Sequence, residues 1–248
     1  MNFGAIIIGD EILCGKRQDK HLPKLIELLG ARGLTLAWAQ YLGDDPALIT
    51  ATLARTLAGG DVVFSFGGIG ATPDDHTREC AARAAGVDLA LHPDAEAEIR
   101  ARFGDEITPR RLMMGEFPVG ASIIANPYNR VPGFSLGNHH FVPGFPQMAW
   151  PMVEWVLENR YREVFAPGSI AERSIIVRGC GESQLVDLMN DCLALYPRLK
   201  VFSLPRMEPQ RHVELGVRGH AADVPAAIGI LQAGVDTLGF EWSDPAVP

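Results

Sequence analysis

The feature that most restricts the fold of this chain is a repeated order of apolar strand, short turn and helix. Buried strands are predicted at 4–9, 34–42 and 61–68, and each precedes a segment with apolar residues at helical spacing. Repeated units of this kind are typical of an α/β fold with a mostly parallel sheet that helices cover on both faces. Such sheets bind ligands beyond the carboxyl ends of their strands, so the turns after these strands are the first place to search for a site.

The second half of the chain changes its pattern. Two further strands are predicted at 121–126 and 139–144, for which an antiparallel arrangement is open, and a helix follows at 148–161. Near residue 166 the pattern restarts as strand, helix, strand, strand and helix, an order that indicates an α+β domain. We therefore expect an α/β domain over residues 1–165 and a small α+β domain over residues 166–248.

Charge and cysteine content argue against several function classes. The chain carries 22 Lys and Arg against 30 Asp and Glu, and this net charge of −8 disfavours nucleic-acid binding. No apolar run approaches the roughly 18 residues of a membrane span, and the N-terminal segment lacks the basic region of a signal peptide. Four scattered cysteines show no metal-ligand spacing, and we expect all four to be buried thiols of a cytoplasmic protein. They are Cys14, Cys80, Cys180 and Cys192.

The stretch FSFGGIGATPDDHT, residues 64–77, begins like a phosphate-binding loop. Its glycine spacing matches neither the dinucleotide fingerprint nor the Walker motif. The glycines nevertheless allow a sharp turn that brings backbone amides close to a ligand. Thr72 is predicted to cap a helix that begins at Pro73. The predicted ligand-binding residues of this loop are Gly67, Gly68, Gly70 and Thr72.

Two carboxylates, Asp74 and Asp75, stand where a phosphate site is expected to offer only amides and positive charge. One interpretation is a capping box from Thr72 to Asp75, with acids that favour the helix dipole. The other is a bound divalent cation, with Mg²⁺ as the expected ion, which would lie between the carboxylates and the phosphates. Both interpretations stay open at this point.

Acid pairs also follow the first two strands. Asp10–Glu11 and Asp44–Asp45 come directly after them, and parallel strands would bring both pairs to the edge that carries the glycine loop. An acid after a strand is usually a helix cap, so each pair alone says little. Together the three acidic turns predict a pocket with converging carboxylates. The predicted metal ligands are Asp10, Asp74 and Asp75.

Several motifs in one order resemble the molybdopterin-binding domain family. The combination GDEIL…YLGDDP…GGIGATPDDHT…ANPYNRVPGF…VPGFPQM is most similar to the N-terminal branch of competence/damage-inducible protein A (CinA), over about residues 3–165. RGCGESQL resembles the small domain that follows in CinA proteins. The deamidase domain of many CinA proteins has no counterpart before Pro248, so we do not expect that activity. The resemblance implies a three-layer α/β/α fold and a homo-oligomer.

The resemblance also implies two functions. In the molybdenum-cofactor branch such domains bind molybdopterin, and acids that match Asp44 and Asp75 serve adenylylation or metal insertion, which implies catalytic roles for both. In the CinA-like branch the family is associated with metal-dependent cleavage of nucleotide diphosphates such as ADP-ribose or FAD. We therefore expect binding of a small phosphorylated ligand, a pterin or a nucleotide, with pyrophosphohydrolysis as the alternative. Neither function requires a nucleic acid or a membrane.

Residues 126–146 are rich in Pro and Gly, which form turns. The functional interpretation is that Gly133 and Gly144 let a pterin or base approach the backbone. The family often has N-P-x-G here, whereas this chain has Asn129 at the fourth position, and Asn tolerates positive φ. His139 and His140 alternate along a strand and point to opposite faces, so we expect one of them to be a satisfied core or surface histidine rather than a metal ligand.

Overall fold

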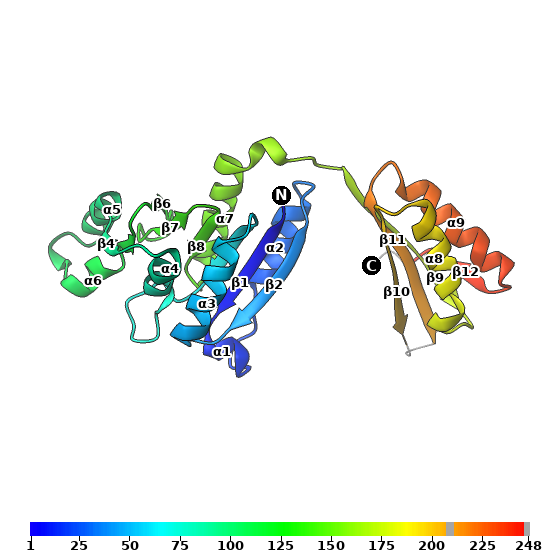
Figure 1. Cartoon of the computed structure of the whole chain (residues 1–248), viewed down its shortest axis with the longest axis horizontal. Coiled ribbons are helices and arrows are strands. Elements are labelled where there is room, and N and C mark those ends of the chain that lie inside the picture. Colours follow the sequence, from blue (N-terminus) through cyan, green and yellow to red (C-terminus); the bar gives the residue numbers. More distant parts are fainter. Residues whose placement is uncertain (207–210, 246–248) are drawn as a thin grey trace. The chain divides into compact units, whose positions relative to one another are not determined.

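The computed structural model describes residues 1–206 and 211–245, which form two compact units (Figure 1). The first unit comprises Met1–Ala31 and Thr35–Phe165, and the second comprises Arg32–Leu34 and the chain from Ala166 onward.

The first unit carries the larger sheet. Its elements, in chain order, are β1 (Phe3–Ile8), α1 (Asp10–Leu13), α2 (His21–Gly30), β2 (Leu36–Leu42), α3 (Pro46–Leu57), β3 (Val62–Phe66), α4 (Thr77–Ala85), β4 (Leu89–Leu91), α5 (Pro93–Phe103), α6 (Pro109–Met113), β5 (Glu116–Pro118), β6 (Ser122–Ile124), β7 (Gly133–Leu136), β8 (His139–Val142) and α7 (Pro146–Arg160). Short 3-10 turns follow at Gly104–Glu106 and Arg162–Val164.

Six strands form a mixed sheet in the order β2-β1-β3-β8-β7-β6. β2, β1, β3 and β8 are parallel, whereas β7 and β6 are antiparallel additions at one edge. In register, Ile6 of β1 lies beside Ser65 of β3, and Ser65 lies beside Phe141 of β8. The four parallel strands therefore end at the same edge of the sheet.

Helices cover both faces, which explains why the central strands are apolar throughout. α3 and α4 pack on one face, where Ile6 and Ile8 meet Ile49 and Leu53 in a buried cluster. α2 and α7 pack on the other face, where Phe66 stacks on His21. Every residue of β1 and β3 is buried, because helices cover the apolar side chains on both faces of these parallel strands. The predicted α/β/α fold class is confirmed.

Three strands of the first unit were absent from the sequence-based prediction. β8 does not pair with β6, because β7, an unpredicted strand of four residues, lies between them. The Pro-Gly segment that seemed to be a turn thus begins a buried strand at Gly133. β4 and β5 form a separate two-stranded sheet that the pattern also missed.

The second unit is a smaller α+β body. Its elements are β9 (Ile170–Arg178), the 3-10 turn Glu182–Gln184, α8 (Val186–Leu195), β10 (Lys200–Arg206), β11 (His212–His220), α9 (Val224–Thr237) and β12 (Glu241–Ser243). The strands form an antiparallel sheet in the order β10-β11-β9-β12, the split βαβ arrangement. β12 completes the strand–helix–strand–strand–helix order that the sequence predicts. Ile175 and Leu215 meet Leu231 of α9 in its core.

The structure also bears on the expectations about membrane-spanning helices and about the cysteines. Among the described residues, none of the helices is long and apolar enough to cross a membrane. All four cysteines are free thiols; three are buried, but Cys14 is exposed, contrary to the expectation that all four would be buried. Cys14 follows the single turn of α1, which contributes no buried residue to the core.

Candidate functional site

A pocket of about 460 Å³ lies at the carboxyl edge of the parallel strands in the first unit. The turns after β1, β2, β3 and β8 contribute Gly9, Asp44, Gly67 and Gly144 to its lining. This is the edge at which open α/β sheets bind ligands, and the volume falls in the ordinary range for small-molecule sites.

The loop between β3 and α4 is held by its carbonyl groups. The Thr77 hydroxyl donates to the Gly67 carbonyl at 3.0 Å, and the Thr77 N–H donates to the Gly68 carbonyl at 2.9 Å. Because C=O and N–H of a trans peptide point in opposite directions, the N–H groups of Gly68 and Ile69 point away from α4. The N–H groups of residues 68–71 form no hydrogen bond with any residue that the structure describes.

A buried arginine orients a third peptide of this loop. Arg78, only 4% exposed, donates through Nη2 to the Gly70 carbonyl at 2.8 Å. Its Nη1 donates to the carbonyls of Met113 and Glu116. The Gly70 carbonyl therefore points to α4, and the N–H of Ala71 points away from it. The loop thus presents a row of unpaired donors, which is suited to an anion.

Glycine is required at three positions of this loop. Gly67 has φ +99°, and a Cβ there would collide with the Ile8 carbonyl. Gly68 has φ +68°, and a Cβ there would also collide with the Thr77 hydroxyl. Gly70 has no positive φ, but a Cβ there would collide with the Asp75 carboxylate. The glycines therefore permit close packing against Ile8 of β1, Thr77 of α4 and Asp75 of the loop itself.

The segment after the glycines is a turn rather than the first turn of a helix. The Asp75 N–H donates to the Thr72 carbonyl at 3.0 Å, which is the hydrogen bond of a β-turn with Pro73 at its second position. The Asp75 carboxylate accepts the Thr72 N–H at 2.8 Å and also the Thr72 hydroxyl. The prediction that Thr72 caps a helix beginning at Pro73 is wrong, because α4 begins only at Thr77, where the loop carbonyls bind.

The two other acidic turns are tied to each other. The Asp10 N–H donates to the Asp44 carboxylate at 2.9 Å, and the Asp44 N–H donates to the Asp10 carboxylate at 3.2 Å. Burial raises the pKa of Asp44, and the hydrogen bond that its carboxylate accepts from the Asp10 N–H opposes this effect. The nearby carboxylates of Asp10, Glu11 and Asp74 raise the pKa of Asp44 further. All three acidic turns therefore contribute to one region of negative potential, as the sequence predicts.

A resident metal ion can be tested against these residues. The oxygen-only donor set has the chemistry of a site for a hard cation such as Mg²⁺. In residues 1–206 and 211–245, however, no three His, Cys, Asp or Glu side chains gather into a group that could hold a metal. The carboxylates of Asp10, Asp44 and Asp75 are each engaged by backbone N–H groups. The described residues therefore provide negative charge at this edge without a preformed metal centre.

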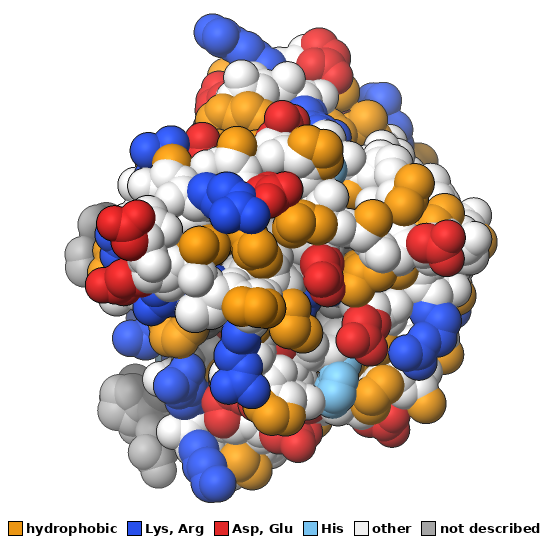
Figure 2. All heavy atoms as spheres, turned by 90° about the vertical axis from the view of Figure 1, so that its left-hand side faces the viewer, with side chains coloured by type: hydrophobic (Ala, Val, Ile, Leu, Met, Phe, Trp, Pro, Cys, Tyr) orange, Lys and Arg blue, Asp and Glu red, His pale blue; other side chains and the backbone are white. Residues whose placement is uncertain are grey.

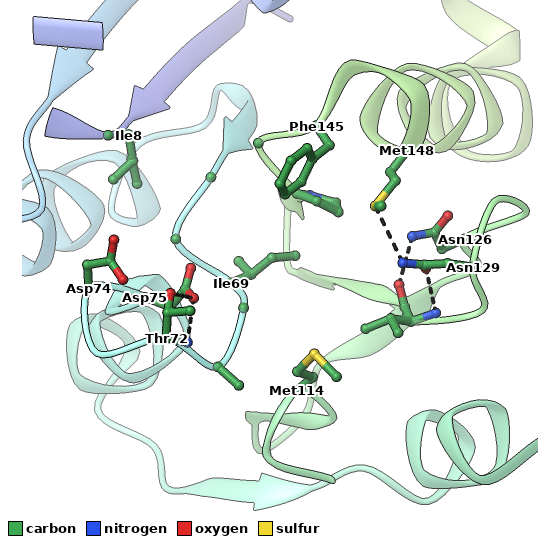
Figure 3. A pocket seen from close by; sticks show the side chains of 18 of the residues that line it. Ile8, Ile69, Thr72, Asp74, Asp75, Met114, Asn126, Asn129, Phe145 and Met148 are labelled. Carbon is green, nitrogen blue, oxygen red and sulfur yellow. Dashed lines mark hydrogen bonds between the residues drawn. The ribbon is translucent and has the colours of Figure 1, made fainter. Parts of the chain in front are cut away.

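The opposite wall of the pocket is apolar (Figure 3). Met114 and Met148 lie across from Asp74 and Asp75, and Ile69 points toward that wall. The remaining apolar residues of the whole pocket lining are Ile8, Ala71, Phe103, Val131, Pro132, Pro143 and Phe145. A flat, partly apolar ring suits such a wall, because methionine and aromatic side chains pack well against ring faces.

The loop from Asn126 to Val131 closes this wall and is held by its own side chains. The Asn126 side chain donates to the Val131 carbonyl at 2.9 Å and accepts the Tyr128 N–H at 3.0 Å. The Asn129 side chain accepts the Val131 N–H at 3.0 Å. The positive φ that we expected Asn129 to tolerate lies instead on Arg130, at +62°, whose side chain pairs with a glutamate of α5. The turn therefore exists, displaced by one residue.

The structure gathers most of the predicted site residues. The pocket lining includes Gly67, Gly68, Gly70, Thr72, Asp44, Asp74, Asp75 and Gly144. Two others lie outside that lining. Asp10 acts through its bonds to Asp44, and Gly133 is buried in β7, where a Cβ would collide with the Phe141 carbonyl. Sequence reasoning missed Arg78, because a charged residue on a helix is ordinarily exposed.

Both adjacent histidines are satisfied core residues, whereas we expected this of one. His139 bonds Thr56 at 2.9 Å, and His140 bonds Ser135 at 2.8 Å and Tyr161 at 2.7 Å. Burial lowers the pKa of His139 to about 4 and that of His140 to about 3, so both rings are neutral in the folded protein.

Charge is mixed on the visible surface. On the face in Figure 2, Lys and Arg side chains are interspersed with Asp and Glu rather than gathered into one basic patch. This face offers no continuous electrostatic surface for a nucleic-acid backbone.

Comparison with known proteins gives matches along the same chain. Residues 4–163 match the family described as "probable molybdopterin binding domain". A CinA-like protein of Anaeromyxobacter sp. (strain K) is 31% identical over 92% of this chain and 57% of its own length. A CinA-like protein of Syntrophotalea carbinolica is 31% identical over 75% of this chain and 47% of its own length. The chain spans about half the length of the curated relatives it matches.

A solved structure is also similar. The CinA protein of Thermoplasma acidophilum, described as being of unknown function, is 29% identical and superposes with a TM-score of 0.59. The match covers 64% of this chain and 98% of that protein.

Proposed function

The chain belongs to the family of probable molybdopterin-binding domains, in its CinA-like branch, and from this premise we propose that its glycine loop binds the phosphate of a pterin or nucleotide. The ring of the ligand would lie against the methionine and phenylalanine wall of the same pocket.

One observation carries this proposal. The N–H groups of Gly68, Ile69 and Ala71 have no hydrogen-bond partner among the described residues, point away from α4, and belong to residues that line the pocket. Unpaired backbone donors beside a ligand pocket are costly unless a ligand or water satisfies them. A phosphate offers several acceptor oxygens to one row of donors, and bonds to an ionised acceptor are the strong ones.

Isothermal titration with ADP tests the proposal. Gly68→Val places a β-branched residue at a positive φ, where its side chain would collide with Thr77. The loop must then change its conformation, which turns the row of N–H donors away from the ligand. We expect the affinity for ADP to fall roughly tenfold or more, since each lost bond to a charged group is worth about 1.5–3 kcal/mol. Gly86→Val is the matched control: Gly86 also has φ +68°, but it ends α4 outside the pocket. Equal losses of affinity in both variants would refute the assignment.

The alternative function is metal-dependent cleavage of a nucleotide diphosphate such as ADP-ribose or FAD. It is favoured by the crowding of Asp10, Glu11 and Asp74 around Asp44, a negative potential that a cation bound together with phosphate oxygens would relieve. In that case Asp74 and Asp75 of the predicted set would supply carboxylate oxygens to Mg²⁺. Asp44 would replace the predicted Asp10, which lies outside the pocket lining. The ion would neutralise phosphate charge and activate a water.

This alternative predicts different behaviour for two kinds of aspartate. With Mg²⁺ or Mn²⁺ present, release of AMP from ADP-ribose should fall by an order of magnitude or more in Asp44→Asn and in Asp75→Asn. Asp45→Asn is the control, because Asp45 caps α3 by accepting the N–H of Ala47, and Asn caps equally well. If AMP release is absent in the wild type, or equal in all three variants, these aspartates act only as backbone acceptors.

Assembly and location complete the proposal. We expect a homo-oligomer, as in the family, and light scattering should report at least twice the monomer mass of 26.9 kDa. A mass equal to the monomer at micromolar concentration would contradict this. The four free cysteines support a reducing cytoplasm as the place of action.

A further inference from the structure

The lining of the main pocket carries an excess of negative charge. Among the described residues that line it, Arg17 is the one Lys or Arg, and four carboxylates oppose it, those of Glu11, Asp44, Asp74 and Asp75. Like charges repel, and salt screens partly enclosed charges less than exposed ones. A ligand with two phosphates therefore needs a full positive charge in this pocket in addition to the partial charges of the loop amides.

Arg78 does not offer its charge to a ligand directly. Its side chain lies on the α4 side of the glycine loop and is 4% exposed, and it does not line the pocket. Its two Nη atoms donate to the carbonyls of Gly70, Met113 and Glu116. Arg17 therefore remains as the cationic side chain that can contact a phosphate inside the pocket.

The backbone fixes the place from which the Arg17 side chain extends. The Arg17 N–H donates to the Glu11 carbonyl at 2.9 Å, and Gly15, at φ +73°, turns the chain between them. The Glu11 carboxylate folds back over the turn after β1, because a Cβ on Gly9 would lie 2.6 Å from its Oε2. Arg17 therefore extends from the same edge of the sheet that carries the glycine loop.

The guanidinium of Arg17 is only weakly held by its acidic neighbour. Nη1 of Arg17 lies 3.8 Å from Oε1 of Glu11, and the two side chains are 61% and 41% exposed. Exposed ion pairs of this kind contribute little to stability, so exchange of the carboxylate for a phosphate costs little. The planar guanidinium also matches two oxygens of a phosphate and forms charge-assisted hydrogen bonds with them.

Arg17 lies at a different part of the main pocket from the glycine loop. It also lines two further cavities, of about 320 Å³ and about 680 Å³, whereas none of residues 67–72 lines either of them. A phosphate on the loop amides therefore leaves Arg17 available for the next anionic group of the ligand.

We propose that Arg17 binds the second phosphate of the ligand and makes the site selective for diphosphates over monophosphates. This inference rests on the proposed function, because the glycine loop must hold the first phosphate. It adds a specificity-determining residue to that function and restricts the ligand from a phosphate ester to a diphosphate ester.

Two probes that differ by one phosphate test the role of Arg17. Titrated in EDTA, so that no divalent cation neutralises the phosphates, the wild type should bind ADP about tenfold more tightly than AMP, the value of one charge-assisted hydrogen bond. Arg17→Gln lacks the charge and the fork of donors. It should bind ADP no more tightly than AMP, while its affinity for AMP stays within about twofold of the wild type.

Lys16→Gln is the matched control, because Lys16 is the exposed neighbour of Arg17, carries the same charge, and lines none of the three cavities. It should retain the preference for ADP. Equal affinities of the wild type for ADP and AMP, or the same loss of preference in both variants, would overturn the role of Arg17 while leaving the glycine loop as a phosphate site. A preference for ADP that survives in Arg17→Gln would overturn it as well.

If ADP does not bind the wild type, the proposed function itself fails. Inorganic pyrophosphate then tests Arg17 separately, through the side-chain ¹⁵Nε NMR signal of this residue. A saturable shift of that signal supports the cation site, and no shift up to about 10 mM pyrophosphate overturns it.

Discussion

Replacing Arg78 by methionine should lower the free energy of unfolding of the first unit by about 3 kcal/mol and weaken ADP binding at the same time. The guanidinium is buried and donates to the carbonyls of Gly70, Met113 and Glu116. Without it these acceptors lose charge-assisted bonds in a place that water does not reach. The Gly70–Ala71 peptide also loses the contact that orients it, so one of the phosphate donors becomes free to rotate.

Arg83→Met is the matched control for this prediction. Arg83 lies on the same helix, but its side chain is 60% exposed and its ion pair with Glu79 spans 3.8 Å. An exposed pair of this kind contributes little, so the change in stability should stay within about 0.5 kcal/mol. Urea unfolding of both variants, followed at the amide signals of β3, measures the difference. Similar stabilities for Arg78→Met and Arg83→Met would mean that Arg78 does not anchor the loop.

Acidification from pH 7 to pH 5 should destabilise the first unit by roughly 4 kcal/mol through two histidines. Burial depresses the pKa of His139 to about 4 and of His140 to about 3, both below the ordinary value of 6.5. Between pH 6.5 and about 4 the unfolded chain therefore binds two protons that the folded chain excludes. The contribution of the two neutral histidines to the free energy of unfolding is fully present above pH 6.5. It is lost as the pH falls, at about 1.4 kcal/mol per pH unit for each ring.

His140→Phe isolates one of these contributions. The variant loses the bonds to Ser135 and Tyr161 and is less stable at every pH, but the slope of its stability against pH should fall by one proton. His220→Gln, at an exposed position that ends β11, is the control and should retain the wild-type slope. Unfolding by urea at a series of pH values gives all three slopes. An unchanged slope in His140→Phe would show that this ring is protonated in the folded state.

The parallel part of the fold could be predicted from the sequence because its signals are local. Strands such as Phe3–Ile8 and Val62–Phe66 are continuous apolar runs bounded by turn residues, and the order of elements restricts how they assemble. β7 could not be predicted, because Gly133–Leu136 is short and begins inside a Pro-Gly segment whose local signal is a turn. Its strand conformation comes from pairing with β6 and β8, which is a long-range effect.

The site shows the same division. The position of the site at the carboxyl edge and the glycines that line it were predicted, because strand ends and glycine loops can be recognised from consecutive residues. The beginning of α4 was misplaced, since Thr-Pro-Asp-Asp has the composition of both a capped helix and a β-turn. The decisive contacts come from the loop carbonyls, which bind Thr77 and Arg78. The methionine wall is built from segments far apart in the sequence, so no local pattern predicts it.

The most direct test of the phosphate site follows the loop amides themselves. In an amide NMR titration of the ¹⁵N-labelled chain with ADP, we expect the signals of Gly68, Ile69 and Ala71 to shift together and to saturate. The N–H groups of Thr72 and Thr77, already bonded to Asp75 and Gly68, should shift less. Saturable binding of ADP with the signals of Gly68, Ile69 and Ala71 unmoved would contradict the proposal that these donors hold the phosphate.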